Sequence, residues 1–149
     1  MRFWIIGLLA FWGGFVPAGM AASAKIIKVL PQYVDLEGRH SLSPSLYDRD
    51  AYQAQLRKNP KRRSGLRFDV QWRSAEKGPL KLRVEMRGSN AKELTQAVLE
   101  GEVGQTGFSK WTTLNLKGEE YKKFGELAAW RATLWDGEKL VSEQKSFLW

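Results

Sequence analysis

The chain contains no cysteine and only one histidine, His40. The lack of cysteine excludes disulfides and cysteine-ligated zinc, and a single imidazole excludes sites that need two or three. A serine triad would have to use His40, whose neighbours Gly38 and Ser41 are typical of a loop. Proline accounts for 5 of the 149 residues and hydrophobic residues for 43%, which excludes collagen-like and low-complexity sequences. We therefore expect one globular domain, and we assign it no catalytic residue, no metal and no cofactor.

Charge is almost missing from the first 24 residues, which have the three parts of a secretory signal. Arg2 provides the basic start, an apolar run follows, and Ala22-Ser-Ala24 places small residues at the last and third-last positions. Cleavage before Lys25 would leave residues 25–149 as a single domain of ordinary size. An uncleaved membrane anchor is the alternative, but glycines and a proline interrupt the apolar run. We expect export to the periplasm or the cell exterior, with no membrane span after cleavage.

Two segments alternate between apolar and polar residues, as half-buried strands do. In residues 66–73 and again in residues 80–87, the even positions are apolar and the odd positions are polar. The link between the two segments contains Gly78-Pro79, which is a turn signal. We therefore predict a hairpin with Trp72 opposite Leu80 and with the even-numbered side chains in the core.

Five more segments complete a set of seven expected strands, at residues 26–36, 94–103, 108–117, 127–135 and 139–148. The last two flank Asp136-Gly137, a dipeptide that suits the left-handed turn of a tight hairpin. The fourth expected strand alternates less regularly, and Gly101 within it indicates a bulge.

One short helix is expected over residues 45–58, between the first and second strands. Ser45 and Asp48 have the spacing of a capping box, and Asn59-Pro60 would end the helix. Its apolar residues do not form one stripe, so we expect the helix to lie across an end of the sheets. A helical turn or crossover loop is expected at residues 118–125.

These segments resemble a fibronectin type III or immunoglobulin-like β-sandwich. Residues 68–72, a short turn with a proline, and residues 81–87 are similar to the second and third strands of a type III module, whose core tryptophan matches Trp72. Residues from Trp130 onward are similar to its last two strands. The resemblance implies an all-β fold, a seven-stranded antiparallel sandwich to which this chain adds one short helix between strands one and two. It carries no functional site with it. The chain also resembles small exported bacterial proteins.

Basic residues outnumber acidic ones, 24 to 16, and the formal net charge of +8 at pH 7 favours anionic partners. The densest basic cluster consists of Arg57, Lys58, Lys61, Arg62, Arg63 and Arg67. Three interpretations stay open: cations that suit the end of the helix, a site for an anionic glycan, lipid headgroup or cell-surface polymer, and a nucleic-acid site. Export, and the lack of an aromatic residue inside the run, disfavour nucleic acid.

Position parity separates inward from outward tryptophans. Trp72 and Trp130 are expected in the core, whereas Trp111 and Trp135 are expected to face outward. An exposed indole on a sheet can stack on a sugar ring, so Trp111 and Trp135 are candidate glycan-stacking residues. Alternatively, a neighbouring strand or the helix covers them. Trp149, at the end of an extended last strand, could pair with the sheet edge of a partner.

Asp69 and Glu85 are expected on one outward face, where a pair of carboxylates can cleave glycosides. Nearby arginines would lower both pKa values, although a general acid needs a raised pKa. The predicted hairpin also sets Asp69 opposite Arg83, which favours an ion-paired surface.

The sequence thus predicts an exported, non-catalytic binding module for protein interaction or envelope assembly, with an unknown partner protein. This hypothesis requires an exposed apolar patch or an unpaired sheet edge. The alternative is a binder of carbohydrate or of an anionic cell-surface polymer, through Trp111, Trp135 and the basic cluster. A hydrolase that uses His40, or Asp69 with Glu85, is the weakest hypothesis.

Overall fold

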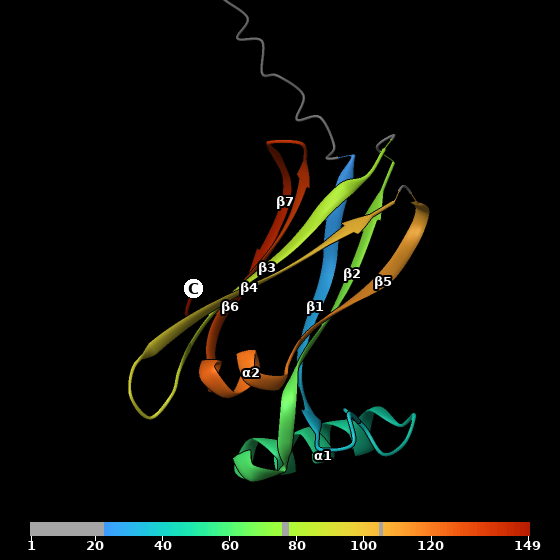
Figure 1. Cartoon of the computed structure of the whole chain (residues 1–149). Coiled ribbons are helices and arrows are strands. Elements are labelled where there is room, and N and C mark those ends of the chain that lie inside the picture. The colour runs from blue at the N-terminus through green and yellow to red at the C-terminus, as the bar shows by residue number, and fades with distance from the viewer. Residues whose placement is uncertain (1–22, 76–77, 105) are drawn as a thin grey trace, which may run out of the picture.

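The computed structural model describes residues 23–75, 78–104 and 106–149, which form two antiparallel β-sheets and two α-helices (Figure 1). The strands are β1 (Ala24–Asp35), β2 (Arg63–Ser74), β3 (Leu80–Ser89), β4 (Leu94–Val103), β5 (Thr106–Lys117), β6 (Glu126–Asp136) and β7 (Lys139–Lys145). The helices are α1 (Leu46–Lys58) and α2 (Gly118–Phe124), and a 3-10 turn, η1 (Pro60–Arg62), links α1 to β2. Within these described ranges, the seven predicted strands and the short helix after the first strand are confirmed. The predicted signal at residues 1–24 lies almost wholly outside them.

The seven strands are divided between the sheets in the orders β1–β2–β5 and β4–β3–β6–β7. The predicted hairpin is therefore wrong, because Trp72 of β2 pairs with Ile26 of β1 and Lys110 of β5 instead of Leu80. The link after Ser74 carries the chain from one sheet to the other. Alternation determines only which face of a strand is buried. The apolar faces of β2 and β3 are buried equally well when the two strands lie in opposite sheets as when they pair in a hairpin.

The two sheets pack their apolar faces together, and the predicted parity of β2 and β3 is confirmed. The side chains at most 2% exposed include Leu66, Phe68, Val70 and Trp72 of β2 and Leu80, Leu82, Val84 and Met86 of β3. Trp130 of β6 packs against this core, edge-on to Phe68 with the ring centroids 6.5 Å apart. The Nε1 of Trp72 donates to the Oγ1 of Thr112 on β5 (2.8 Å), which satisfies the polar atom of a buried indole.

Helix α1 lies across the lower end of the sheets in Figure 1, as the sequence predicts. Ser45 caps its first turn, since the Oγ accepts a hydrogen bond from the backbone N of Asp48 (3.4 Å). The buried residues of α1 are Tyr52, Gln53 and Leu56. The Gln53 side chain accepts from the backbone N of Tyr33 and donates to its carbonyl, both at 2.8 Å. These two bonds join α1 to the end of β1.

The hairpin of β6 and β7 turns one residue later than the sequence predicts. Asp136 pairs with Lys139, so Gly137 and Glu138 form the turn. Gly137 has a φ of +56°, and no described residue other than glycine has a positive φ. A positive φ only at the first turn residue is the type II′ pattern, which matches the twist of a hairpin.

Gly101 does not form the predicted bulge. It pairs with Leu82, and β3 and β4 pair without any register shift. A Cβ at Gly101 would lie 3.2 Å from the Cδ2 of Leu114 on β5. The glycine therefore makes room for a side chain of the facing sheet.

Candidate functional site

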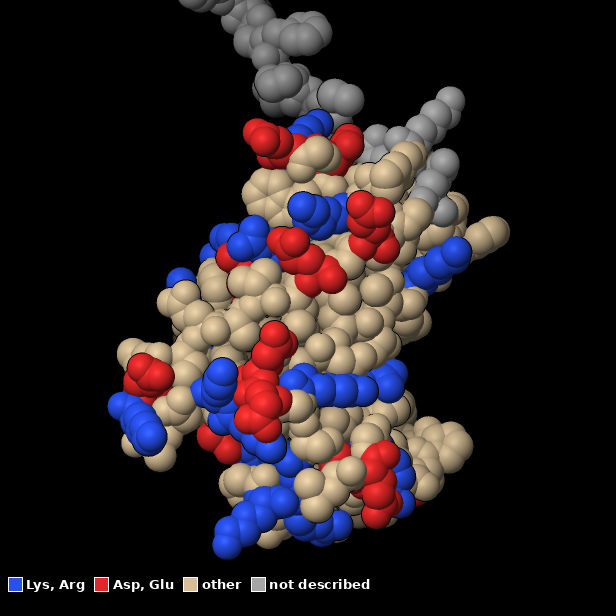
Figure 2. All heavy atoms as spheres, viewed as in Figure 1, with Lys and Arg blue, Asp and Glu red and all other residues tan. Residues whose placement is uncertain are grey.

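The predicted basic cluster contains four exposed residues, Arg57 and Lys58 at the end of α1 and Lys61 and Arg62 in η1. We call these four residues the basic end. In the described part of the chain, none of them forms an ion pair with an acidic residue. Figure 2 shows basic side chains gathered at the lower left of the molecule, where α1 ends in Figure 1. The positive charge of the basic end is thus available to an anion from solvent.

Arg63, the next residue of the predicted cluster, is buried. Its guanidinium donates to the carbonyl oxygens of Leu56 and Arg57 and to the Oε1 of Glu126 on β6, the last at 2.5 Å. The same group lies 4.0 Å from the ring centroid of Tyr33 on β1. Arg63 therefore joins the end of α1 to both sheets, and its donors are occupied inside the protein.

Arg67, the last residue of the cluster, lies on the outer face of the three-stranded sheet. Its Nε donates to both carboxylate oxygens of Asp69 (2.9 Å), and the hydroxyl of Thr113 donates to Asp69 as well (2.6 Å). Trp111 lies on the same face, opposite Gln71, and is 49% exposed. We call these five residues the Trp111 face. It presents an exposed indole beside side chains that form hydrogen bonds.

Trp135 lies on the outer face of the other sheet. Its neighbour Leu134 is fully buried in the core, so alternation points Trp135 outward. The indole is half-buried, and its Nε1 donates to the Oγ1 of Thr133 (2.8 Å). The outer faces of the two sheets point in opposite directions, so Trp111 and Trp135 do not form one platform.

The carboxylates of Asp69 and Glu85 also lie on opposite outer faces. Glu85 belongs to β3 in the four-stranded sheet, where the Nε of Arg131 donates to it at 2.8 Å. The expectation that the two carboxylates approach each other is wrong, because it assumed that β2 and β3 pair. They cannot act on the two sides of one glycosidic bond.

His40 lies half-buried in the loop before α1. Burial, together with the nearby Arg67 guanidinium, lowers the pKa of His40. The hydroxyl of Ser41 donates to the carbonyl of Ser43 (2.6 Å). This hydroxyl is thus directed to a backbone carbonyl, and the serine–histidine bond that a nucleophile needs is not formed here.

The last residues do not extend β7 as predicted, because the strand ends at Lys145. The chain then turns, and the backbone N of Trp149 donates to the carbonyl of Ser146 (3.2 Å). The guanidinium carbons of Arg87 and Arg131 lie 4.0 and 5.5 Å from the Trp149 ring centroid. These cation–π contacts place Trp149 on the outer face of the four-stranded sheet.

β4 is an edge strand with little protection on its free side. Natural edge strands usually carry lysine, proline or a bulge, which discourage pairing with another chain. The other edge strands follow this rule: β1 contains Pro31 and two register shifts, β5 contains Lys110 and Lys117, and β7 has only seven residues with a lysine at each end. β4 contains no lysine, proline or register shift, and its residues 94–99 are uncharged. We call this side the free edge of β4.

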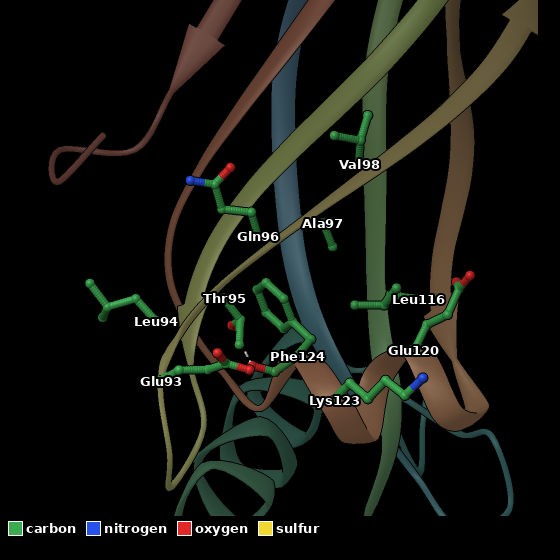
Figure 3. Close-up of a pocket in the computed structure, with 10 residues that line it drawn as sticks. All are labelled: Glu93, Leu94, Thr95, Gln96, Ala97, Val98, Leu116, Glu120, Lys123 and Phe124. Atoms are coloured by element: carbon green, nitrogen blue, oxygen red, sulfur yellow. Dashed lines mark hydrogen bonds between the residues drawn. The ribbon is translucent and has the colours of Figure 1, made fainter.

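A groove of about 490 Å³ lies beside the first half of β4 (Figure 3). It is lined by residues 93–98, Leu116 of β5, and Glu120, Lys123 and Phe124 of α2. The hydroxyl of Thr95 donates to the carbonyl of Phe124 (2.6 Å), which joins β4 to the end of α2. On the outer side of β4, Leu94 is 89% and Val98 is 48% exposed. The sequence analysis did not identify this surface, although the uncharged run of β4 was a visible signal.

Compared with protein-family models, with curated proteins and with solved structures, the chain has no match. Among the described residues, the helices are too short or too polar to cross a membrane. The same residues contain no group of three or more histidine, aspartate or glutamate side chains that could hold a metal ion. The choice between functions therefore depends on the basic end, the Trp111 face and the free edge of β4.

Proposed function

We propose that the chain is an exported, non-catalytic module that binds protein partners through the free edge of β4. The observation that carries this proposal is a ten-residue edge strand without lysine, proline or bulge, beside a groove with apolar side chains. An extended segment of a partner would add to β4 as a further strand. Backbone hydrogen bonds would supply affinity, and alternate side chains of the partner would enter the groove and supply specificity.

The strand order supports a fold of the immunoglobulin-like and fibronectin type III kind. In a constant-type immunoglobulin domain, the fourth strand lies in the same sheet as the first, second and fifth. In this chain β4 pairs with β3 instead, which leaves three strands in one sheet and four in the other. This arrangement favours the type III-like form, and it also creates the free edge of β4.

Export is the second part of the proposal, and the signal-like pattern of the first 24 residues supports it. β1 begins at Ala24, which pairs with Ser74. Cleavage before Lys25 would therefore remove Ala24 and leave the rest of β1 in place. N-terminal sequencing of the chain recovered from the envelope and the medium of a producing bacterium tests this. An uncleaved chain retained in the cytoplasm would contradict export.

Site-specific photo-crosslinking tests the proposed binding edge. A photoreactive residue replaces Val98 on β4 in one variant and Tyr47 on α1, which is 83% exposed, in the control variant. We expect protein adducts at position 98 and none at position 47. With the adduct partner purified, its binding should slow the amide hydrogen exchange of residues 94–98, since strand addition uses their free backbone groups. Equal adducts at both positions, or unchanged exchange in β4, would refute the proposal.

Binding of carbohydrate or of an anionic cell-surface polymer is the alternative function, and two observations favour it. The basic end presents four exposed cations that have no acidic partner among the described residues, and the Trp111 face presents an exposed indole with polar neighbours. Cations attract polyanions from a distance, and an indole can stack on the apolar face of a sugar ring.

Retention on immobilised heparin tests the basic end. Reversal of Arg57, Lys58, Lys61 and Arg62 to glutamate is compared with reversal of four exposed lysines elsewhere, Lys110, Lys117, Lys139 and Lys145. Both variants have the same net charge, so a specific site predicts earlier elution for the first variant only.

Binding to neutral polysaccharides tests the Trp111 face. If this face binds sugar rings, the Trp111→Ala variant should lose that binding. Equal elution of both charge variants, with no effect of Trp111→Ala, would exclude this function.

A further inference from the structure

We infer that the partner at the free edge of β4 is a second copy of this chain, paired through β4 in an antiparallel, two-fold symmetric manner. The inference rests on the proposed function, because it names the partner of the same edge. The four-stranded sheets of the two copies would then form one continuous sheet. Two-fold dimers require a self-complementary surface, and the side chains along β4 provide one.

The complementarity is seen when the two-fold axis passes through Gln96. Only registers that place even-numbered residues opposite even-numbered ones keep the outer side chains on one face. With the axis at Gln96, Leu94 of each copy lies opposite Val98 of the other. In the same register, the exposed Lys92, in the turn just before β4, comes near Glu100 of the other copy at each end of the paired segment. Apolar residues thus meet apolar ones on both sides of the central Gln96 pair, and opposite charges come together at both ends.

Neighbouring registers lack this match. With the axis at Ala97, Leu94 would lie opposite Glu100, and with the axis at Val98 it would lie opposite Glu102. Each of these registers places a carboxylate against the most exposed apolar side chain of β4. Of the axes at Gln96, Ala97 and Val98, the charge and hydrophobic patterns therefore favour the one at Gln96.

The inner side of β4 also suits a second strand in this register. There Thr95 of one copy lies opposite Ala97 of the other, and both side chains line the groove. Both are small, so a second backbone can approach β4 without displacing Phe124 or Leu116. The added strand would cover the apolar surface that Leu94 and Val98 expose in the single copy.

Sedimentation velocity with charge variants tests the pairing. We expect a dimer of the unmodified chain, and at least tenfold weaker association for Lys92→Glu or for Glu100→Lys. The double variant should restore the dimer, because the pairs are re-formed with exchanged signs. Glu102→Lys is the control, since it faces the same side outside this charge pair and should have little effect. Circular dichroism checks that each variant is folded.

Cysteine crosslinking tests the register, because the chain has no cysteine of its own. In Gln96→Cys the two thiols would face each other across the axis, within the Cα separation of about 7 Å that a disulfide allows. Oxidation should therefore yield a covalent dimer of Gln96→Cys and none of Leu94→Cys. A mixture of Leu94→Cys and Val98→Cys should crosslink to a heterodimer.

The outcomes separate this inference from the function on which it rests. A chain that stays monomeric at all concentrations, with no crosslink of Gln96→Cys, overturns the two-fold dimer. If the photoreactive residue at position 98 still attaches to a different protein that protects β4, binding at the free edge stands with another partner. If neither occurs, the proposed function fails too.

Discussion

Gly88 lies at a crowded point where β3 passes the end of α2 and the start of β6. A Cβ at this position would lie 2.4 Å from the carbonyl oxygen of Glu126 and 2.6 Å from the Cζ of Phe124. The β3–β6 register also shifts between Arg87 and Gly88. A glycine allows this close approach of two strands and a helix. With a larger residue, the backbone at Glu126 would have to shift.

Gly88→Ala should therefore lower the free energy of unfolding by about 2–3 kcal/mol, as overpacking of a filled interior does. Gly104→Ala is the matched control, because a Cβ there meets nothing within 4 Å. Its effect should stay within about 0.5 kcal/mol. Urea denaturation of the two variants measures both values, and equal losses would show that Gly88 is not under steric pressure.

Asp35 is a buried carboxylate at the end of β1, 4% exposed. It accepts hydrogen bonds from the hydroxyl of Tyr52 (2.6 Å), the backbone N atoms of Glu37 (2.9 Å) and Arg39 (2.8 Å), and the Nε of Arg39 (2.8 Å). Burial alone would raise the pKa of Asp35, but the hydrogen bonds from Tyr52 and Arg39 outweigh it and hold the pKa well below its usual range.

Asp35→Asn should lower the free energy of unfolding by about 2 kcal/mol at neutral pH. Both oxygens of the carboxylate accept hydrogen bonds, whereas the amide would turn an NH2 donor toward some of the same donor groups. The folded pKa lies below the unfolded value of about 3.9, so the stabilisation is present above that pH and is lost as pH falls toward the folded pKa. Denaturation of both proteins between neutral and acidic pH should show the difference shrinking below about pH 4. A difference that stays constant through the acidic range would argue against this role of Asp35.

At the scale of elements, Arg63 helps to attach α1 to the sheets. The last carbonyl groups of a helix lack the regular backbone donors, and the Arg63 guanidinium donates to two of them, those of Leu56 and Arg57. The Leu56 carbonyl also accepts from the backbone N of Asn59 (3.3 Å). The same side chain reaches Glu126 and the Tyr33 ring, and burial raises the pKa of Tyr33 to about 12. Arg63 thus joins α1 to both sheets, in addition to the hydrogen bonds that side chains of the helix itself make to β1.

Arg63→Met should lower the free energy of unfolding by about 3 kcal/mol, because it removes the donor to the Arg57 carbonyl, one of the two donors to the Leu56 carbonyl and the cation that pairs with Glu126. Arg62→Met changes an adjacent, exposed arginine and should cost less than about 0.5 kcal/mol. Thermal denaturation followed by circular dichroism compares the two variants. A similar loss in both would mean that the lost charge matters, and that the contacts of Arg63 do not.

The elements themselves and the hairpin of β6 and β7 could be predicted from the sequence, but the other strand pairings could not. Alternation of Phe68, Val70 and Trp72 with polar residues identifies a strand and its buried face. It says nothing about the neighbouring strand, and the turn signal Gly78-Pro79 suggested the wrong one, in a register chosen to set Asp69 opposite Arg83. In the structure Asp69 binds Arg67 of its own strand instead.

The candidate surfaces could likewise be predicted only where they come from one continuous segment of the chain. The exposed residues of the basic end come from one continuous segment, so the sequence could identify them. The burial of Arg63 depends on Glu126, and the position of Trp149 depends on Arg87, each far away in the chain. The groove beside β4 likewise needs α2 at its side, which no local pattern predicts.

At the scale of the whole molecule, the two long sides of the sandwich differ in how the sheets are joined. On one side, the backbone N of Ile26 on β1 donates to the Oγ of Ser142 on β7 (2.9 Å), and the Nε2 of Gln144 donates to the carbonyl of Ile27 (3.1 Å). On the other side, no hydrogen bond joins β4 directly to β5 in the described residues. The bond from Thr95 to the end of α2 is the nearest equivalent.

This difference predicts where a single copy loosens first. Detachment of β4 breaks pairing with β3 alone, whereas detachment of β2 breaks pairing on both of its edges. Native-state amide exchange at low protein concentration should therefore show β4 amides exchanging through a partial opening, and β2 amides only through global unfolding. Uniform exchange in both strands would contradict this. A strand that detaches readily can also be exchanged between two copies. We therefore expect domain swapping and fibre growth of this fold to begin at the free edge of β4.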